Sequence, residues 1–378
     1  MKKLFENRNV LFISIGFFWI FLGFGGAQQY LVPLLKLQGK EHLGLTSLLI
    51  LYTTVLIGGI FAPKILHSIG LKKSLLIGAI TYLLFSLSVM LNNAFILLAA
   101  SVLIGFGAIL LWQSSGQIIV DSSTNENIGR NLGLQFSLFL FGMLFGTAIG
   151  GLLIKVFSLQ ILYLFFSLTI LVSIPFLIKV IPKINNTPDK KFNIYYLFKP
   201  KLLLLLPLVF SSYFFSGQSF AAINLIVLNL FGLGFVGIMA TIFRISTVTG
   251  GLTIGKISDM YQKETILYIT TGIGIIGGVL FLSSSSALLV GLGLILLGIF
   301  TSTAYPVCLS LLKQVTAETD YKYALGAFHV YANLGIVCAI LATRYINLRM
   351  SLIIGVVLML SIFPTIYVFS KGFTKKSF

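Results

Sequence analysis

Polar side chains that could contact a ligand recur inside long apolar stretches of this sequence. Gln28 and Gln29 stand side by side in the first stretch, and Arg244 is the only charge deep inside one. An amide without a hydrogen-bond partner is costly to bury in an apolar medium, and a charge costs more. These side chains must therefore meet protein, water or a solute. A guanidinium suits bidentate recognition of a carboxylate or phosphate, which favours an anionic solute.

Similar polar positions occur in further apolar stretches. Gln113 and Gln117 share one face of a helix because they are four residues apart, and the segment TSTAYP brings Tyr305. We expect the following residues to line a cavity for a solute: Gln28, Gln29, Trp112, Gln113, Gln117, Gln218, Asn224, Arg244, Tyr305 and His329. The alternative stays open that the amides join packed helices, an interaction of about 0.6–2 kcal/mol in membranes.

The charged residues limit the mechanisms that are open to this chain. No Asp or Glu lies near the middle of an apolar stretch, although proton-coupled transport usually needs such a carboxylate. His329, of a residue type whose ordinary pKa is about 6.5, is the one substitute, but a lone histidine is more often a packed hydrogen-bonding group. No glycine-rich phosphate loop precedes a lysine, and the three histidines and two cysteines form no metal-ligand cluster. We expect no catalytic residue, no cofactor and no metal.

The elements that position these side chains are membrane-spanning helices. The chain of 378 residues is 57% hydrophobic and 9% charged, whereas about 25% of the residues in a soluble domain are charged. Its apolar stretches reach the roughly 20 residues that a helix needs to cross a bilayer. The sequence predicts an all-α membrane protein with twelve transmembrane helices near residues 9–36, 44–69, 71–91, 94–120, 128–156, 159–181, 201–231, 233–258, 264–283, 286–313, 321–346 and 349–371. The first stretch is too long for a signal peptide and is expected to remain as a span.

Two halves of six helices are expected. The longest connection, from Pro182 to Lys201, is basic and polar. It predicts an N-terminal bundle (1–183), a linker (184–200) and a C-terminal bundle (201–378). The segment GGIFAPKILHSIGLKK, which starts at Gly58, aligns without gaps with GGLTIGKISDMYQKET, which starts at Gly250. Parallel repeats of this kind are typical of secondary transporters.

The net charge of +17 is spread over short loops. Phosphate binding needs basic residues on one face, so a nucleic-acid partner is not expected. Most basic residues fall on one side of the twelve predicted helices; the few on the other side are Lys36, Lys40, Lys155, Arg344 and Arg349. The positive-inside rule then places both termini and the linker in the cytoplasm, with the chain in the cell membrane.

The helix number, the basic central loop and the paired loop motif resemble the major facilitator superfamily. The loop motif of that family has glycine, three residues, aspartate, a basic residue, any residue, glycine and two basic residues. Matching positions are Gly70, Lys72 and Lys73 in the first copy and Gly255, Asp259 and Lys263 in the second. The first copy has His67 in place of aspartate, as in the Unc-type (uncoordinated, ion-channel-regulator-like) branch. The segment from Gly105 to Gly133, with Leu111-Trp112 and Gly129-Arg130, is similar to the same branch.

This resemblance implies a transporter that moves a small-molecule solute by rocker-switch alternating access. The first, fourth, seventh and tenth helices would line the central cavity, the six loop-motif residues would form a gate, and the chain would work as a monomer in the lipid bilayer. A non-transporting scaffold that regulates a partner membrane protein is the main alternative, as in some Unc-type relatives. A drug exporter would need an acidic cavity, and the sequence has none.

Overall fold

A computed structural model of the chain describes residues 7–123, 128–154, 156–182, 198–315 and 321–374. The first helices are α1 (Arg8–Leu37), α2 (Glu41–Ile69), α3 (Leu71–Met90), α4 (Ala94–Asp121), α5 (Ile128–Leu153) and α6 (Leu159–Ile178). They are followed by α7 (Pro200–Leu203), α8 (Leu206–Phe220), α9 (Ala222–Phe231), α10 (Leu233–Met260), α11 (Lys263–Ser283), α12 (Ala287–Val315), α13 (Tyr321–Tyr345), α14 (Leu348–Leu360) and α15 (Ile362–Thr374). Among these described residues, twelve helical stretches are long and apolar enough to cross a membrane, which confirms the predicted fold class.

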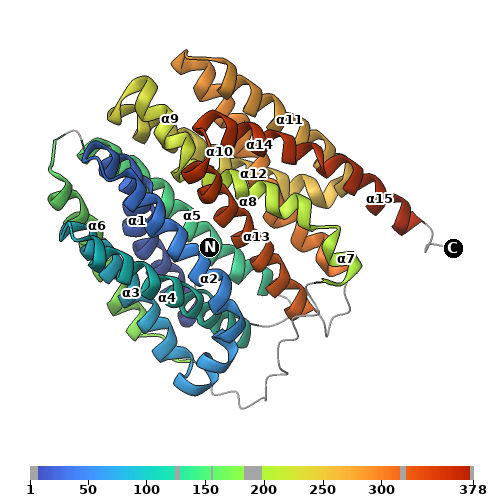
Figure 1. The fold of residues 1–378 in the computed structure, drawn as a ribbon. Helices are drawn as coiled ribbons and strands as arrows, with labels where there is room; N and C mark the ends of the chain where they lie inside the picture. The colour runs from blue at the N-terminus through green and yellow to red at the C-terminus, as the bar shows by residue number, and fades with distance from the viewer. Residues whose placement is uncertain (1–6, 124–127, 155, 183–197, 316–320, 375–378) are drawn as a thin grey trace. The chain divides into compact units, whose positions relative to one another are not determined.

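The helices form two compact units, Met1–Lys191 and Phe192–Phe378. In the first unit, α1 packs against α5 and α6, α4 packs against α2 and α3, and α3 packs against α6. The second unit has the same pairs in the same order: α8 packs against α13 and α14, α12 against α10 and α11, and α11 against α14 (Figure 1). The fold is therefore a pair of six-helix repeats.

The seventh and twelfth spans are interrupted, so the continuous helices predicted at 201–231 and 349–371 are wrong in this respect. Proline has no N–H to bond to the carbonyl four residues earlier. Pro207 lies four residues after the end of α7 at Leu203, and Pro364 lies four residues after the end of α14 at Leu360. A third interruption lies at Ala221, between α8 and α9, where φ is −115° and ψ is −103°.

Glycines allow close helix contacts at corresponding places in the two units. A Cβ atom on Gly78 of α3 would lie 2.8 Å from the carbonyl oxygen of Gly107 on α4. A Cβ atom on Gly277 of α11 would lie 2.8 Å from the carbonyl oxygen of Gly293 on α12, and the reverse distance is also 2.8 Å. Small residues at such contacts are typical of membrane helix bundles, because they let backbones approach.

Candidate functional site

Gln28 and Gln29 lie in α1, which is enclosed by α2, α5 and α6. Their side chains are only 2% and 1% exposed. Gln28 Nε2 donates a hydrogen bond to Tyr52 Oη on α2, with 2.6 Å between the two atoms. Adjacent residues of a helix point about 100° apart, so both amides avoid lipid only because protein surrounds α1 over a broad arc. Tyr52 is half-buried.

Two tyrosine hydroxyls also hold α1 in the first unit. Tyr30 Oη donates to the carbonyl oxygen of Thr147 on α5 at 2.8 Å. Tyr163 Oη, on α6, donates to the carbonyl oxygen of Ala27 at 2.7 Å. The region around the two glutamines is therefore anchored to the fifth and sixth helices of its unit.

Trp112 of α4 belongs to an aromatic cluster in the first unit. Its ring centroid lies 5.1 Å from that of Phe17, 5.5 Å from that of Phe21 and 5.0 Å from that of Phe139. The indole is half-buried, whereas Phe17 is fully buried. The cluster joins α1, α4 and α5, and it leaves part of the indole exposed.

Gln113 and Gln117 lie apart from this cluster. Both are exposed, on the same face of α4 as Phe106 and Val120, which are 40% and 43% exposed. The two amides thus lie on an exposed face of α4, whereas Gln28 is buried among the helices of the first unit.

Gln218 of α8 is fully buried inside the second unit. Its Nε2 donates to Ser351 Oγ on α14 at 2.6 Å and to the carbonyl oxygen of Ala339 on α13 at 3.3 Å. Its Oε1 accepts a hydrogen bond from Thr343 Oγ1 at 3.1 Å. These contacts favour the interhelical role that the sequence left open. Asn224 of α9 is also buried, at 2% exposure, and interacts within the chain.

Arg244 lies in α10 and is 8% exposed. Its Cζ atom lies 5.8 Å from the ring centroid of Phe243, and the residue has further interactions within the chain. In the same helix, Thr241 and Ser246 donate to the carbonyl oxygens of Gly237 and Ile242. The guanidinium is thus held inside protein within a span.

The remaining cavity candidates lie in α12 and α13. His329 of α13 is exposed, with its ring at 5.6 Å from that of the neighbouring Phe328. Tyr305 belongs to α12, but its side chain is outside the described part of the structure.

The predicted gate residues lie at helix ends. Gly70 ends α2 and precedes α3 with φ of +87°, a left-handed conformation that favours glycine. Lys72 and Lys73 stand in the first turn of α3, and Lys263 is the first residue of α11. Cations are disfavoured at helix N-termini because of the helix dipole, so the helices themselves gain nothing from these lysines. The side chains of Gly255 and Asp259 in α10 lie outside the described residues.

The start of α1 carries a contact that the sequence analysis missed. The N–H of Ile181, just after α6, donates to Asn9 Oδ1 at 2.9 Å, and Asn9 Nδ2 donates to the carbonyl oxygen of Ile181 at 2.8 Å. Asn7 caps α1 and also donates to the carbonyl oxygen of Ser122 at the end of α4. Asparagine before an apolar stretch signals a helix N-cap, but it does not reveal the distant partners.

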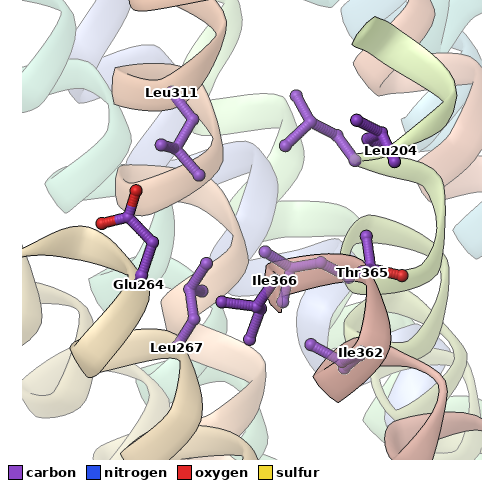
Figure 2. A pocket seen from close by; sticks show the side chains of 9 residues that line it. Leu204, Glu264, Leu267, Leu311, Ile362, Thr365 and Ile366 are labelled. Atoms are coloured by element: carbon purple, nitrogen blue, oxygen red, sulfur yellow. The ribbon is translucent and has the colours of Figure 1, made fainter. Parts of the chain in front are cut away.

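A cavity of about 20 Å³ lies in the second unit, among α8, α11, α12 and α15. Figure 2 shows its aliphatic lining, with Glu264 of α11 at the edge. The hydroxyl of Thr365, the other polar lining residue, donates to the carbonyl oxygen of Ser361 at 2.9 Å. A space of this size holds about one water molecule. It is therefore too small to bind an organic solute.

Comparison with known proteins adds a family and a fold. The family model described as Major Facilitator Superfamily matches residues 13–294. The UNC93-like protein MFSD11 of Xenopus tropicalis is 29% identical over 142 residues, which cover 37% of this chain and 32% of the relative. Protein unc-93 homolog A of Bos taurus is 31% identical over 144 residues, or 36% of this chain and 30% of the relative. The matched segment thus spans about a third of the length of these relatives.

One solved structure illustrates the agreement in fold. It is a POT family transporter in complex with a thioalcohol-conjugated peptide, and it matches with a TM-score of 0.79 at 13% identity. The match covers 97% of this chain and 96% of that one. At this identity the similarity concerns the arrangement of the helices.

Proposed function

Because this chain belongs to the major facilitator superfamily and resembles its Unc-type branch, we propose that it is a secondary transporter that moves a small solute across a membrane by alternating access. The matching family and the repeated six-helix units support this proposal. So does the presence of buried polar side chains inside the spans, since an apolar core alone offers a solute no hydrogen bonds.

We propose an organic anion as the solute, and Arg244 is the single observation that carries this choice. The residue lies about 16 Å along α10 from its start at Leu233, at about 1.5 Å per residue. That depth is close to the middle of a hydrocarbon layer about 30 Å thick. A guanidinium at this depth costs roughly 2.5–3.5 kcal/mol on insertion scales. This cost favours a role in binding the solute over a purely structural role. The alternative is that Arg244 only joins helices of the second unit.

The gate proposal concerns the ends of α2 and α10 and the starts of α3 and α11. We propose that both termini face the cytoplasm in the cell membrane, and that Asp259 forms charge pairs with lysines at that side. These pairs would break when the protein opens inward. Gly70 would allow the sharp turn between α2 and α3, and the lysines would supply the positive partners.

The experiment is uptake by reconstituted proteoliposomes, with radiolabelled lactate, succinate and glycerol 3-phosphate as probes. We expect Arg244→Gln to abolish uptake of the transported anion and Arg244→Lys to weaken it, because a lysine lacks the guanidinium fork. Arg349→Gln removes an exposed arginine and serves as the matched control.

Normal anion uptake by Arg244→Gln, or transport of cations only, would refute the anion proposal while leaving a transporter in place. If the native protein transports none of the probes, and a broader panel of neutral and cationic solutes also fails, the scaffold alternative is favoured.

A further inference from the structure

The breaks in the seventh and twelfth spans that depend on proline lie beside the same cavity of the second unit. Leu204 and Leu205, which separate α7 from α8, line the cavity of about 20 Å³, and so does Ile362, the first residue of α15. Figure 2 shows Leu204 and Ile362 on two of the segments that border this space. Two weak points of the helices and an unfilled space therefore coincide.

Both breaks contain a hydrogen bond that is shorter in sequence than that of an α-helix. The N–H of Leu205 donates to the carbonyl oxygen of Leu202 at 3.0 Å, three residues earlier. The N–H of Ser361 donates in the same way to the carbonyl oxygen of Leu358 at 3.2 Å. A tight turn of this kind within a longer helical span often marks a hinge.

Two hydroxyl groups favour a bend at the second break. Ser361 Oγ donates to the carbonyl oxygen of Leu358 at 2.6 Å, and Thr365 Oγ1 donates to the carbonyl oxygen of Ser361 at 2.9 Å. Hydroxyl bonds to carbonyls of the preceding turn often bend helices. In a membrane, serine and threonine hydroxyls also help to satisfy the backbone around a proline. Together with Pro364, they make Ser361 the point at which the twelfth span bends most readily.

The helices are joined by different contacts on the two sides of this break. Before it, Ser211 of α8 donates to the carbonyl oxygen of Leu358 on α14 at 3.3 Å. After it, α15 meets α11 through the stacked rings of Phe363 and Tyr268, whose centroids are 5.8 Å apart, and through the aliphatic wall of the cavity. Apolar contacts are not directional, so α15 can shift against α11 while α14 stays bonded to α8.

We propose that α15 is a hinged segment that pivots at Ser361 and moves into the cavity, so that the second unit has an open and a closed form. A void deprives its lining residues of van der Waals contacts, and closure restores them. The α7–α8 break on the opposite wall lets Leu204 and Leu205 adjust to the movement. The movement takes place inside one unit and would occur whether or not the chain transports a solute.

The size of the movement follows from the size of the cavity. The space holds about one water molecule, so closure moves its wall by about 3 Å. Ile366, in that wall, lies about 8 Å along the helix from the pivot at Ser361, and Val368 lies about 10 Å from it. A rotation that moves Ile366 by about 3 Å therefore moves Val368 by about 4 Å.

Distances between two spin labels, measured by double electron–electron resonance in liposomes, test the hinge. In a background with Cys308→Ala and Cys338→Ala, the hinge pair has labels at Val368→Cys on α15 and Ile276→Cys on α11, both exposed positions. We expect two distance populations about 4 Å apart. The control pair has labels at Ile353→Cys on α14 and at Ile276→Cys, and it should give one population because neither position lies beyond the break.

Two kinds of variant test the break and the cavity separately. Pro364→Ala restores the missing N–H and should leave a single population in the hinge pair. Its control is Pro175→Ala, which changes a proline inside the continuous helix α6. Leu267→Phe fills the cavity and should also leave a single population, whereas Leu267→Met keeps the side-chain volume and should leave both. Leu311→Phe repeats the filling from another wall of the cavity.

Three results would overturn the proposal. The first is a single population of the hinge pair in the native protein. The second is persistence of both populations in Pro364→Ala or in the phenylalanine variants that keep the distance of the control pair and are therefore folded. The third is an equal loss in Pro175→Ala or Leu267→Met, which leave the break and the cavity in place. Loss of one population in the test variants alone would support the hinge.

Discussion

Gly277 of α11 provides a quantitative test of the helix packing in the second unit. A Cβ atom there would lie 2.7 Å from Leu296 Cβ, 2.8 Å from the carbonyl oxygen of Gly293 and 2.9 Å from the amide nitrogen of Leu297. Two of these atoms are backbone atoms of α12, so a side-chain rotation cannot relieve the contact. Overpacking of this kind typically costs about 1–3 kcal/mol.

The matched control is Gly272, on the same helix, where a Cβ atom would meet nothing within 4 Å. Replacement of a helical glycine by alanine contributes up to about 1 kcal/mol through helix propensity. That gain is common to Gly272→Ala and Gly277→Ala and cancels in their difference. The free energies of unfolding of the two variants should therefore differ by about 1–3 kcal/mol, with Gly277→Ala less stable.

Thermal unfolding in detergent measures this difference. A change of 1 kcal/mol shifts the Tm of a unit of 150–250 residues by about 2–4 °C, so Gly277→Ala should melt about 2–12 °C below Gly272→Ala. Equal melting temperatures, or a higher one for Gly277→Ala, would show that α11 and α12 do not approach as closely as described.

Three further predictions concern the hydrogen bonds and the topology. Gln218→Leu should reduce the free energy of unfolding by about 1–3 kcal/mol and so lower the Tm, because the amide of Gln218 joins helices. The KM for a transported solute should stay unchanged. A raised KM at normal Tm would instead assign Gln218 to the cavity. Asn9→Ala removes the two bonds to Ile181 and should increase hydrogen–deuterium exchange at the end of α6, with unchanged exchange counting against the contact. Membrane-impermeant maleimide should label cysteines at Lys40 and Lys190 from opposite sides, and labelling of both from one side would contradict the proposed orientation.

The number of membrane spans could be predicted from the sequence, because the length of an apolar stretch is a local property that the bilayer thickness selects. Two interruptions also have local causes, since Pro207 and Pro364 lack the N–H that would continue the helix. The hydropathy pattern continues across both prolines and so does not reveal these two interruptions. The break at Ala221 has no such local cause, because alanine is the best helix former.

The candidate site was predictable only in part. Burial of Gln28 and Gln218 follows from the cost of exposing an amide to lipid. Their partners do not, because Tyr52 and Ser351 are brought close by the fold and not by sequence spacing. For Gln113 the four-residue spacing correctly indicates a face shared with Gln117, but periodicity alone cannot say which neighbours that face meets.

The two units secure their first helix to the fifth and sixth by different means, and this affects their robustness to mutation. In the first unit two different residues make these hydrogen bonds: Tyr30 bonds α1 to α5, and Tyr163 bonds α6 to α1. In the second unit three bonds to α13 and α14 converge on the single side chain of Gln218, and Ser211 of α8 adds one bond to the carbonyl oxygen of Leu358 on α14. One substitution thus removes one of these two bonds in the first repeat but three of these four bonds in the second. Repeats with the same architecture can therefore differ in how much sequence drift they tolerate at equivalent helices.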